Sequence, residues 1–358
     1  MGTCRFLYDN AISISTMVSV SSLRAGFVTA AYKEGAGSAI LNTFGTYTGN
    51  EDLEYKVEID DTAAGREVGQ AKYKWQDSDS AWDASSVVTS STRTDSTMTN
   101  GVQISFTSGA GDDFVKGDLW YFKGINLFNP GKAVDLDRNS RIRSTGTPAT
   151  WTITIDMAAE KEVKAAVIFD HNFSASVIIT LQGDADTLFA GGYTTTIPYN
   201  ESKVIHYLVT ASTYQYWQIR INDSANTNGY LECSEIFLGG YFEPSGNFKA
   251  SPSMPIDLVM SKNYTPGGVR RNTFYSQKRI FNLEFPYMST GDDAAFRTLL
   301  NTIGNQDTKQ FKPFYFHVDS ADADEAYLCY LDSLPRTWFK GTKWTLSMKL
   351  EEALKKKL

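Results

Sequence analysis

Adjacent carboxylates are the first residues of this chain that could support catalysis. They stand at Asp60/Asp61, Asp112/Asp113 and Asp292/Asp293. A glycosidase holds its two carboxyl groups roughly 5–10 Å apart across a sugar cleft, whereas neighbours along a strand or turn point in different directions. We therefore interpret the first two pairs as turn residues and the third as acidic residues at the positive end of a helix.

Few histidines are available for catalysis, since the chain contains only His171, His206 and His317. The sequence has no G-x-S-x-G elbow, no H-E-x-x-H helix and no Walker A loop. We interpret each histidine as a hydrogen-bonding residue at a strand end, and we expect no enzymatic activity. A glycan-degrading enzyme is the alternative that remains open.

Oxygen ligands alternate along one loop, at Asp135, Asp137 and Asn139. Such spacing can hold Ca²⁺, but three arginines close by would reduce the affinity for a cation (Arg138, Arg141 and Arg143). A salt-bridged loop without metal is the alternative, and we expect no other cofactor. The acidic segment 319–325 lacks the glycine of an EF-hand loop, and we predict a solvated hairpin tip there.

Carbohydrate binding would need an exposed aromatic platform beside polar side chains. The candidates are Tyr193, Tyr199, Tyr214, Tyr241 and Trp82. Because the chain is rich in aromatic residues, each candidate could equally belong to a core or an interface.

The totals limit the class of protein. The 358 residues predict two to three domains, and 42% hydrophobic residues with a mean hydropathy of -0.30 suit a soluble chain with packed cores. A net charge of -7 argues against an extended nucleic-acid-binding surface. The basic run Lys355–Lys357 is interpreted as a solvated tail. We find no targeting segment and no apolar stretch of the ~20 residues that a membrane helix needs.

The cysteine count favours folding in a reducing compartment. Cys4, Cys233 and Cys329 are odd in number and far apart, and no disulfide framework or metal-ligand spacing follows from them. Cys233 and Cys329 lie in strand-like segments, where we expect small buried side chains.

Most of the elements that must position these residues are predicted to be strands. In the segment 214–244, Trp217, Ile219 and Ile221 alternate with polar residues, a polar turn follows at 222–229, and a second strand covers 230–237. We predict that the two strands form an antiparallel hairpin.

This segment resembles the closing hairpin of a discoidin-like, galactose-binding-type jelly roll, of the version found in structural proteins of bacteriophage tails. The segments 166–184 and 128–144 are similar to the same family. The resemblance implies a jelly roll over residues 1–34 and 126–242, and a structural calcium is often found in such modules near the loop of Asp135.

Residues 35–125 are predicted to be an inserted small β-sandwich. Tyr55, Val57 and Ile59 alternate with charged residues, and similar patterns recur near residues 73, 104 and 120, between glycine- and aspartate-rich turns. The stretch ending in Gly117-Asp118-x-Trp120-x-Phe122 is similar to accessory β modules of phage structural proteins.

Residues 243–358 combine strands with a single helix. Ser289 or Thr290 can cap a helix of about 290–303, in which Phe296, Leu299, Leu300 and Ile303 follow the helical spacing. Strand, helix and strands in this order resemble the β-barrel of tail-tube and distal-tail proteins. The fold class expected for the whole chain is mainly β and multidomain.

The resemblance implies a virion structural protein of a phage tail tip or baseplate, of the distal-tail or minor-tail type. Such a protein is made in the host cytoplasm, joins other tail proteins and forms a homo-oligomeric ring, hexameric by family resemblance. It would bind no nucleic acid and enter no membrane, and a host surface glycan is a further expected partner. The alternative hypothesis is a carbohydrate-binding adhesin whose main role is receptor recognition.

Overall fold

The computed structural model describes residues 2–13, 15–49, 51–78, 80–82, 86–93, 98–249, 254–264, 270–305, 310–332, 336–340 and 343–353. The chain forms two compact units. Unit 1 comprises Met1–Ser21, Ala133–Asn139 and Thr147–Leu358, and unit 2 comprises Ser22–Lys132 and Ser140–Gly146. Strands dominate both units, and helix α1 (Thr290–Ile303) is the one α-helix of the described residues. The predicted mainly β, multidomain fold class is confirmed.

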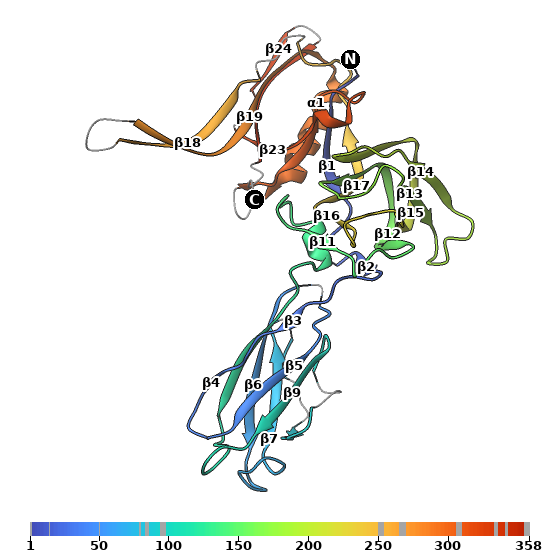
Figure 1. Cartoon of the computed structure of the whole chain (residues 1–358). Helices are drawn as coiled ribbons and strands as arrows, with labels where there is room; N and C mark the ends of the chain where they lie inside the picture. Colours follow the sequence, from blue (N-terminus) through green and yellow to red (C-terminus); the bar gives the residue numbers. More distant parts are fainter. Residues whose placement is uncertain are drawn as a thin grey trace. The chain divides into compact units, whose positions relative to one another are not determined.

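Unit 1 contains an antiparallel sheet of 13 strands that runs from the jelly roll into the C-terminal strands (Figure 1). We call residues 243–358 the barrel after their predicted fold, although no strand pairing among the described residues closes it. The jelly-roll strands follow the order β14 (Tyr193–Ile197), β13 (Ile178–Asp184), β15 (Lys203–Asn222), β12 (Trp151–Phe169) and β17 (Ile236–Phe242). The order continues through β1 (Arg5–Asn10), β22 (Phe314–His317), β23 (Ala326–Leu331), β25 (Lys343–Glu352), β19 (Arg270–Met288) and β18 (Ile256–Tyr264). Off this path, β2 (Met17–Val20) pairs with β12, and β24 (Arg336–Lys340) pairs with β25.

Two long strands shape the jelly roll. The pairing of β12 with β15 breaks register between Asp156 and Lys161, and again between Val163 and Ala165. Irregularities of this kind bend a strand and increase its twist. The first half of β12 therefore pairs with β2, while its second half pairs with β17.

The predicted closing hairpin is wrong in its pairing. Its two strands exist as the end of β15 and as β17, but they do not pair with each other, because β12 lies between them. The polar segment between them is a long connection rather than a tight turn, and it contains the short strand β16 (Glu232–Cys233). Asp223, which is 2% exposed, holds this connection by accepting hydrogen bonds from Ser174 and Asn226.

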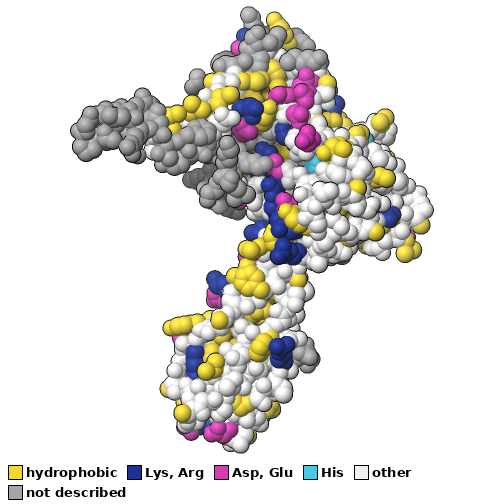
Figure 2. All heavy atoms as spheres, viewed as in Figure 1, with side chains coloured by type: hydrophobic (Ala, Val, Ile, Leu, Met, Phe, Trp, Pro, Cys, Tyr) yellow, Lys and Arg dark blue, Asp and Glu magenta, His cyan; other side chains and the backbone are white. Residues whose placement is uncertain are grey.

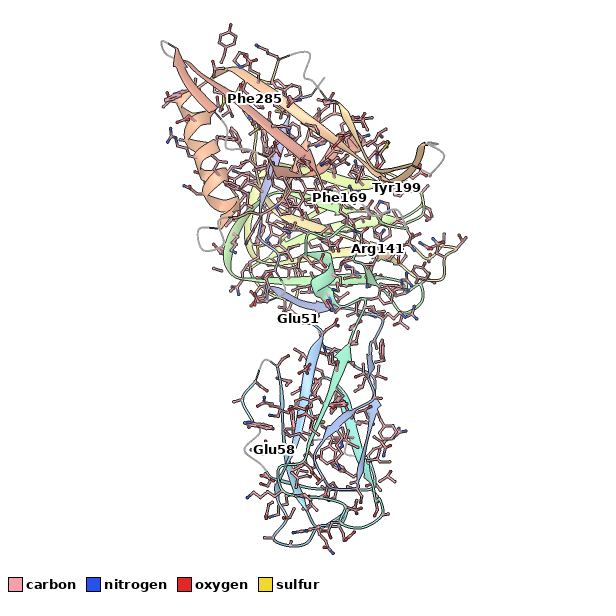
Figure 3. The ribbon with its side chains drawn as sticks, turned by 90° about the vertical axis from the view of Figure 1, so that its left-hand side faces the viewer. Glu51, Glu58, Arg141, Phe169, Tyr199 and Phe285 are labelled. Carbon is pink, nitrogen blue, oxygen red and sulfur yellow. The ribbon has the colours of Figure 1, made fainter. Side chains whose placement is uncertain are left out.

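Helix α1 and the strands of the barrel share an aromatic core. Ser289 caps the helix and forms a capping box with Asp292, as the acidic pair at this helix end led us to expect. Phe296, Leu299 and Ile303 of the helix pack into the core with residues from β19, β22 and β25. Phe285, labelled in Figure 3, belongs to this core. Two short strands follow the helix, β20 (Gly304–Asn305) and β21 (Gln310–Phe311), and the 3₁₀ turn η2 (Ala323–Glu325) lies at the predicted hairpin tip between β22 and β23.

Strand β1 joins the jelly roll to the barrel. It pairs with β17 of the jelly roll along one edge and with β22 of the barrel along the other. Because successive side chains point to opposite faces, Phe6 enters the barrel core and Leu7 enters a second core shared by both parts. Phe169 of the jelly roll stacks on Tyr315 of the barrel in that second core, with 4.2 Å between ring centroids.

Unit 2 is a small β-sandwich, and its strands follow the predicted alternation. The larger sheet has the order β3 (Phe27–Val28), β10 (Leu119–Ile125), β6 (Leu53–Asp61), β7 (Lys72–Asp77) and β8 (Val87–Val88), with β4 (Tyr32–Glu34) also on β10. The second sheet pairs β5 (Ile40–Gly45) with β9 (Val102–Thr107). The unit begins at Ser22 rather than at the predicted residue 35, because β3 and β4 pair with β10. It also takes in η1 (Pro130–Ala133), up to Lys132, and β11 (Ile142–Arg143).

Candidate functional site

The five predicted carbohydrate-binding residues lie at four separate places. Tyr193 and Tyr214 are brought together in the jelly roll, whereas Tyr199, Tyr241 and Trp82 each lie elsewhere. Trp82 belongs to unit 2, and the other four belong to unit 1. The five aromatic residues predicted from the sequence therefore do not form one common site.

Tyr193 and Tyr214 flank the buried Trp217. Their ring centroids lie 6.2 and 5.8 Å from that of Trp217. Gly183 of β13 makes room for this cluster, because a Cβ atom there would lie 2.8 Å from the ring of Tyr214 and 3.0 Å from that of Trp217. Both tyrosines are half-buried, so they offer partly exposed rings on a rigid support.

Tyr199 and Tyr241 have structural partners. The Tyr199 hydroxyl donates to the carbonyl oxygen of Phe173 at 3.3 Å, and its ring lies beside His171 (Tyr199 is labelled in Figure 3). Tyr241 packs edge-on against Tyr207. The guanidinium of Arg5 lies 4.8 Å from the Tyr241 ring centroid and 3.9 Å from that of Tyr207. Tyr241 and Tyr207 both pack against the second core of unit 1.

The loop of the predicted calcium ligands is held by its own backbone. Asp135 accepts a hydrogen bond from the backbone N–H of Asp137, and Asp137 accepts one from that of Asn139. Arg138 pairs instead with Asp170 through two hydrogen bonds of 2.7 and 2.9 Å, and both side chains are nearly buried. Among the described residues, no group of three or more His, Cys, Asp or Glu side chains is arranged to hold a metal ion.

Glu235 is a buried acid that the sequence analysis missed. It is 0% exposed, and within the described part of the chain neither carboxylate oxygen makes a hydrogen bond of good geometry, although Asp135, the Leu136 backbone N–H and the Tyr315 hydroxyl lie beside it. Burial, and then the nearby charge of Asp135, raises the pKa of Glu235 to about 9. The signal in the sequence was an acidic residue directly before the apolar run that begins at Ile236.

Glu235 and Asp135 do not form a calcium site, because Ca²⁺ takes six to eight oxygen ligands and no group of three or more acidic, histidine or cysteine side chains among the described residues is arranged to hold a metal ion. A buried carboxylate without a partner must either keep its proton or neutralise its charge with a counter-ion. The raised pKa of Glu235 favours the first of these, a retained proton.

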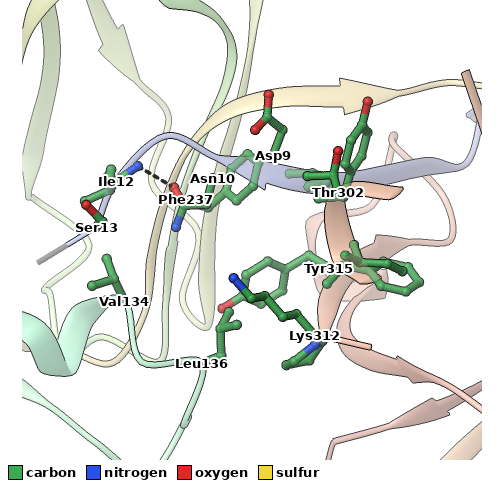
Figure 4. A pocket seen from close by; sticks show the side chains of 15 residues that line it. Asp9, Asn10, Ile12, Ser13, Val134, Leu136, Phe237, Thr302, Lys312 and Tyr315 are labelled. Atoms are coloured by element: carbon green, nitrogen blue, oxygen red, sulfur yellow. Dashed lines mark hydrogen bonds between the residues drawn. The ribbon is translucent and has the colours of Figure 1, made fainter. Parts of the chain in front are cut away.

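A pocket of about 400 Å³ opens in unit 1 beside β1 (Figure 4). Its walls come from β1, from Val134 and Leu136, from Phe237, and from the segments that end α1 and begin β22. The dashed line in Figure 4 is the hydrogen bond of 3.2 Å from the Ile12 backbone N–H to Asn10. Asp9 and Lys312 bring one charge of each sign to the lining.

His171 and His317 form hydrogen bonds at the ends of strands, as predicted. His171 lies 2.9 Å from the carbonyl oxygen of Asn200, and His317 bonds to Tyr207 and to the carbonyl oxygen of Asp322. Burial lowers the pKa of all three histidines, which favours their neutral forms. Cys4, Cys233 and Cys329 are buried free thiols. None of the helices among the described residues has the length and apolar character needed to span a membrane.

Comparisons with known proteins give matches to solved structures alone. No protein-family model and no curated protein matches the sequence. One similar structure is chitosan-binding module 1 of a chitosanase/glucanase from Paenibacillus sp. IK-5, at 16% identity and a TM-score of 0.27, over 32% of this chain and 88% of that chain. Another is the CBM32 module of AlyQ with 4,5-unsaturated mannuronic acid, at 16% identity and a TM-score of 0.24, over 32% and 87% of the two chains. A third is the fucose-binding module SpX-3 of Streptococcus pneumoniae, at 17% identity and a TM-score of 0.26, over 33% and 89%.

Proposed function

We propose that this chain is a structural component of a bacteriophage tail tip or baseplate, where it contacts copies of itself and other tail proteins. The observation that carries the proposal is strand β1, which hydrogen-bonds to the jelly roll along one edge and to the barrel along the other. A shared strand and a shared core connect the two parts directly. Such a scaffold holds its surfaces in fixed positions, which a ring of identical contacts requires.

The pair β18–β19 supports the same proposal. Strand β19 pairs with β25 only from Ile280 onwards, so its earlier residues pair with β18. Figure 1 shows this pair extending from the rest of unit 1. Ile256 and Leu258 of β18 are 56% and 48% exposed. Exposed apolar residues on an edge strand favour pairing with another chain, and a neighbouring subunit would cover them.

Electron microscopy of phage particles labelled with an antibody against this chain tests the proposal. We expect label at the tail tip and, for the purified chain at high concentration, closed rings, with six copies as the number implied by the resemblance. Label found only on the capsid, or none on the particle, would contradict the tail placement. The proposal includes no catalytic activity, and release of reducing ends from host capsule polysaccharide would contradict that part.

Carbohydrate recognition is the second candidate function, and the cluster of Tyr193, Tyr214 and Trp217 favours it. Two half-exposed tyrosine rings on a buried tryptophan can stack on a sugar ring, and a tyrosine hydroxyl can form a polar contact with it. Titration of the chain with host polysaccharide tests this candidate. We expect binding that the Tyr193→Ala/Tyr214→Ala double variant loses, and no binding at millimolar sugar would count against it.

A further inference from the structure

We infer that the outer face of the larger sheet of unit 2 binds a neutral polysaccharide through a row of side chains that crosses four strands. The row consists of Tyr32 on β4, Tyr121 on β10, Lys56 on β6 and Gln76 on β7, and we call it the Tyr32–Gln76 row. None of these four residues was singled out by the sequence analysis. The inference goes beyond the structural role, which would hold without any glycan.

The strand register places these four side chains side by side. Tyr121 lies opposite Tyr32 on one neighbouring strand and opposite Lys56 on the other, and Lys56 lies opposite Gln76. Directly opposed residues of antiparallel strands point to the same face of the sheet. Three strand spacings of about 4.8 Å give the row a length of about 14 Å, which suits a short stretch of sugar chain.

The row lies on the face away from the core of unit 2. Tyr55 and Val57, the neighbours of Lys56 in β6, are 0% exposed and belong to that core. The second sheet, β5–β9, contributes Leu41 and Phe106 to the same core, so it covers the inner face. Tyr32 is 67% exposed. Within unit 2, the Tyr32–Gln76 row is therefore open to a ligand.

Trp82 adds a third aromatic ring and fixes the position of Lys56. The Lys56 ammonium lies 4.9 Å from the Trp82 ring centroid and 5.8 Å from that of Tyr121. The Lys74 ammonium lies 4.4 Å from the same tryptophan. Cation–π contacts of this kind orient a lysine without neutralising it with a carboxylate. Lys56 thus stays available as a hydrogen-bond donor between two rings.

The charges around the row balance, which identifies the class of ligand. Three lysines of this face form ion pairs, Lys74–Glu58 at 3.4 Å, Lys123–Glu54 at 3.6 Å and Lys72–Asp61 at 3.6 Å. Glu34 stands on the same face of β4 as Tyr32 and offsets the charge of Lys56. Glu58 is labelled in Figure 3, and Figure 2 shows both signs of charge interspersed on the visible face of unit 2. A balanced surface gives a polyanion no electrostatic advantage.

A neutral sugar chain uses both kinds of group that the row offers. The C–H face of a pyranose ring packs on flat aromatic rings such as Tyr32 and Tyr121, while its hydroxyls bond to amide, ammonium and carboxylate groups at the edge. Gln76 and Lys56 supply donors, and Glu58 supplies acceptors. The Tyr121 hydroxyl, with an ordinary pKa of about 10, is a donor at neutral pH, and desolvation and the neighbouring glutamates raise its pKa further.

Affinity electrophoresis of the full chain tests the inference, with dextran, mannan and β-glucan as neutral polymers and heparin as the anionic comparison. We expect retardation by at least one neutral polymer and none by heparin. The Tyr32→Ala and Tyr121→Ala variants should each weaken binding about tenfold or more, as truncation of an aromatic anchor does. Tyr287→Ala is the matched control, because Tyr287 is 72% exposed but lies in the barrel of unit 1.

The outcomes separate this inference from both proposed functions. Loss of binding in Tyr32→Ala, with an unchanged melting temperature, supports the row, and a weakened Tyr193→Ala variant alone would place the sugar in the jelly roll and overturn it. Binding of heparin in preference to neutral polymers, or of no polymer at all, would also overturn it. A change of oligomeric state in Tyr32→Ala without any change in sugar binding would show that a protein partner occupies the face. The antibody labelling of phage particles is independent of all these results.

Discussion

Replacing Glu235 by glutamine should stabilise unit 1 at neutral pH. The Glu235 side chain is fully buried, its oxygens make no hydrogen bond of good geometry to any described residue, and Asp135 lies close by. Glutamine keeps the volume of the side chain, carries no ionisable proton and can donate a hydrogen bond to Asp135. The substitution therefore removes the cost of keeping an acid protonated in the folded state.

The magnitude follows from the pKa of Glu235, which rises from an ordinary value of 4.5 to about 9 in the folded chain. Each pKa unit corresponds to about 1.4 kcal/mol, so the 2.5 units between pH 7 and the ordinary value cost about 3 kcal/mol. At pH 7 the folded state binds this proton and the unfolded state does not, so the stability of the wild type falls as the pH rises from 4.5 towards 9. The advantage of Glu235→Gln should be below about 1 kcal/mol at pH 5 and about 3 kcal/mol at pH 7.

Urea unfolding at pH 5, 7 and 8, in the presence of EDTA, measures this difference for the transition of unit 1. Glu201→Gln serves as the control, because Glu201 is exposed and its substitution should change stability little at any pH. If Glu235→Gln is less stable than the wild type at pH 7 in EDTA, the reasoning is refuted.

Three further predictions concern the joint between jelly roll and barrel, and the helix. Phe6→Ala should lower the free energy of unfolding by about 3–5 kcal/mol, because the ring is 0% exposed in the barrel core; a loss below about 1 kcal/mol in urea unfolding would contradict the importance of β1. Arg138→Ala should cost about 3–5 kcal/mol, since it leaves the nearly buried Asp170 without its cation, whereas Arg66→Ala, which removes an exposed ion pair of unit 2, should cost about 1 kcal/mol or less. Equal decreases in the free energy of unfolding for Arg138→Ala and Arg66→Ala would contradict the proposed effect of burial on the ion pair. Ser289→Ala should cost about 1 kcal/mol through the lost helix cap, and an unchanged melting temperature would contradict it.

The pairing of β15 and β17 illustrates where the sequence stops being informative. Alternation in each strand predicted the strands and their buried faces, and Trp217, Ile219 and Ile221 are all 0% exposed. The partner of each strand was not predicted, because an alternating strand can pair with any other strand of the same pattern. The insertion of β12 between β15 and β17 depends on long-range contacts that no local pattern records.

The aromatic residues illustrate the same limit for the site. Composition identified many tyrosines and tryptophans as candidates, yet only Tyr193 and Tyr214 meet. The Tyr32–Gln76 row depends on the register of β4, β10, β6 and β7, which places residues almost ninety positions apart in direct opposition. Glu235 was missed because its burial results from the packing of several distant segments.

The sequence by itself determined the local features of this protein. Alternating apolar residues determined most of the strands, and Ser289 with Asp292 and Asp293 determined the start of the one helix of the described residues, because both depend on neighbours within a few positions. Only the tertiary structure decided that β1 pairs with both the jelly roll and the barrel, and that Glu235 is buried without a well-formed hydrogen bond to any described residue. It alone also decided that Tyr32 of β4 and Tyr121 of β10 point to the same face of the sheet. These features depend on which distant strands become neighbours, and that choice is made by the summed packing of whole faces rather than by any one residue pattern.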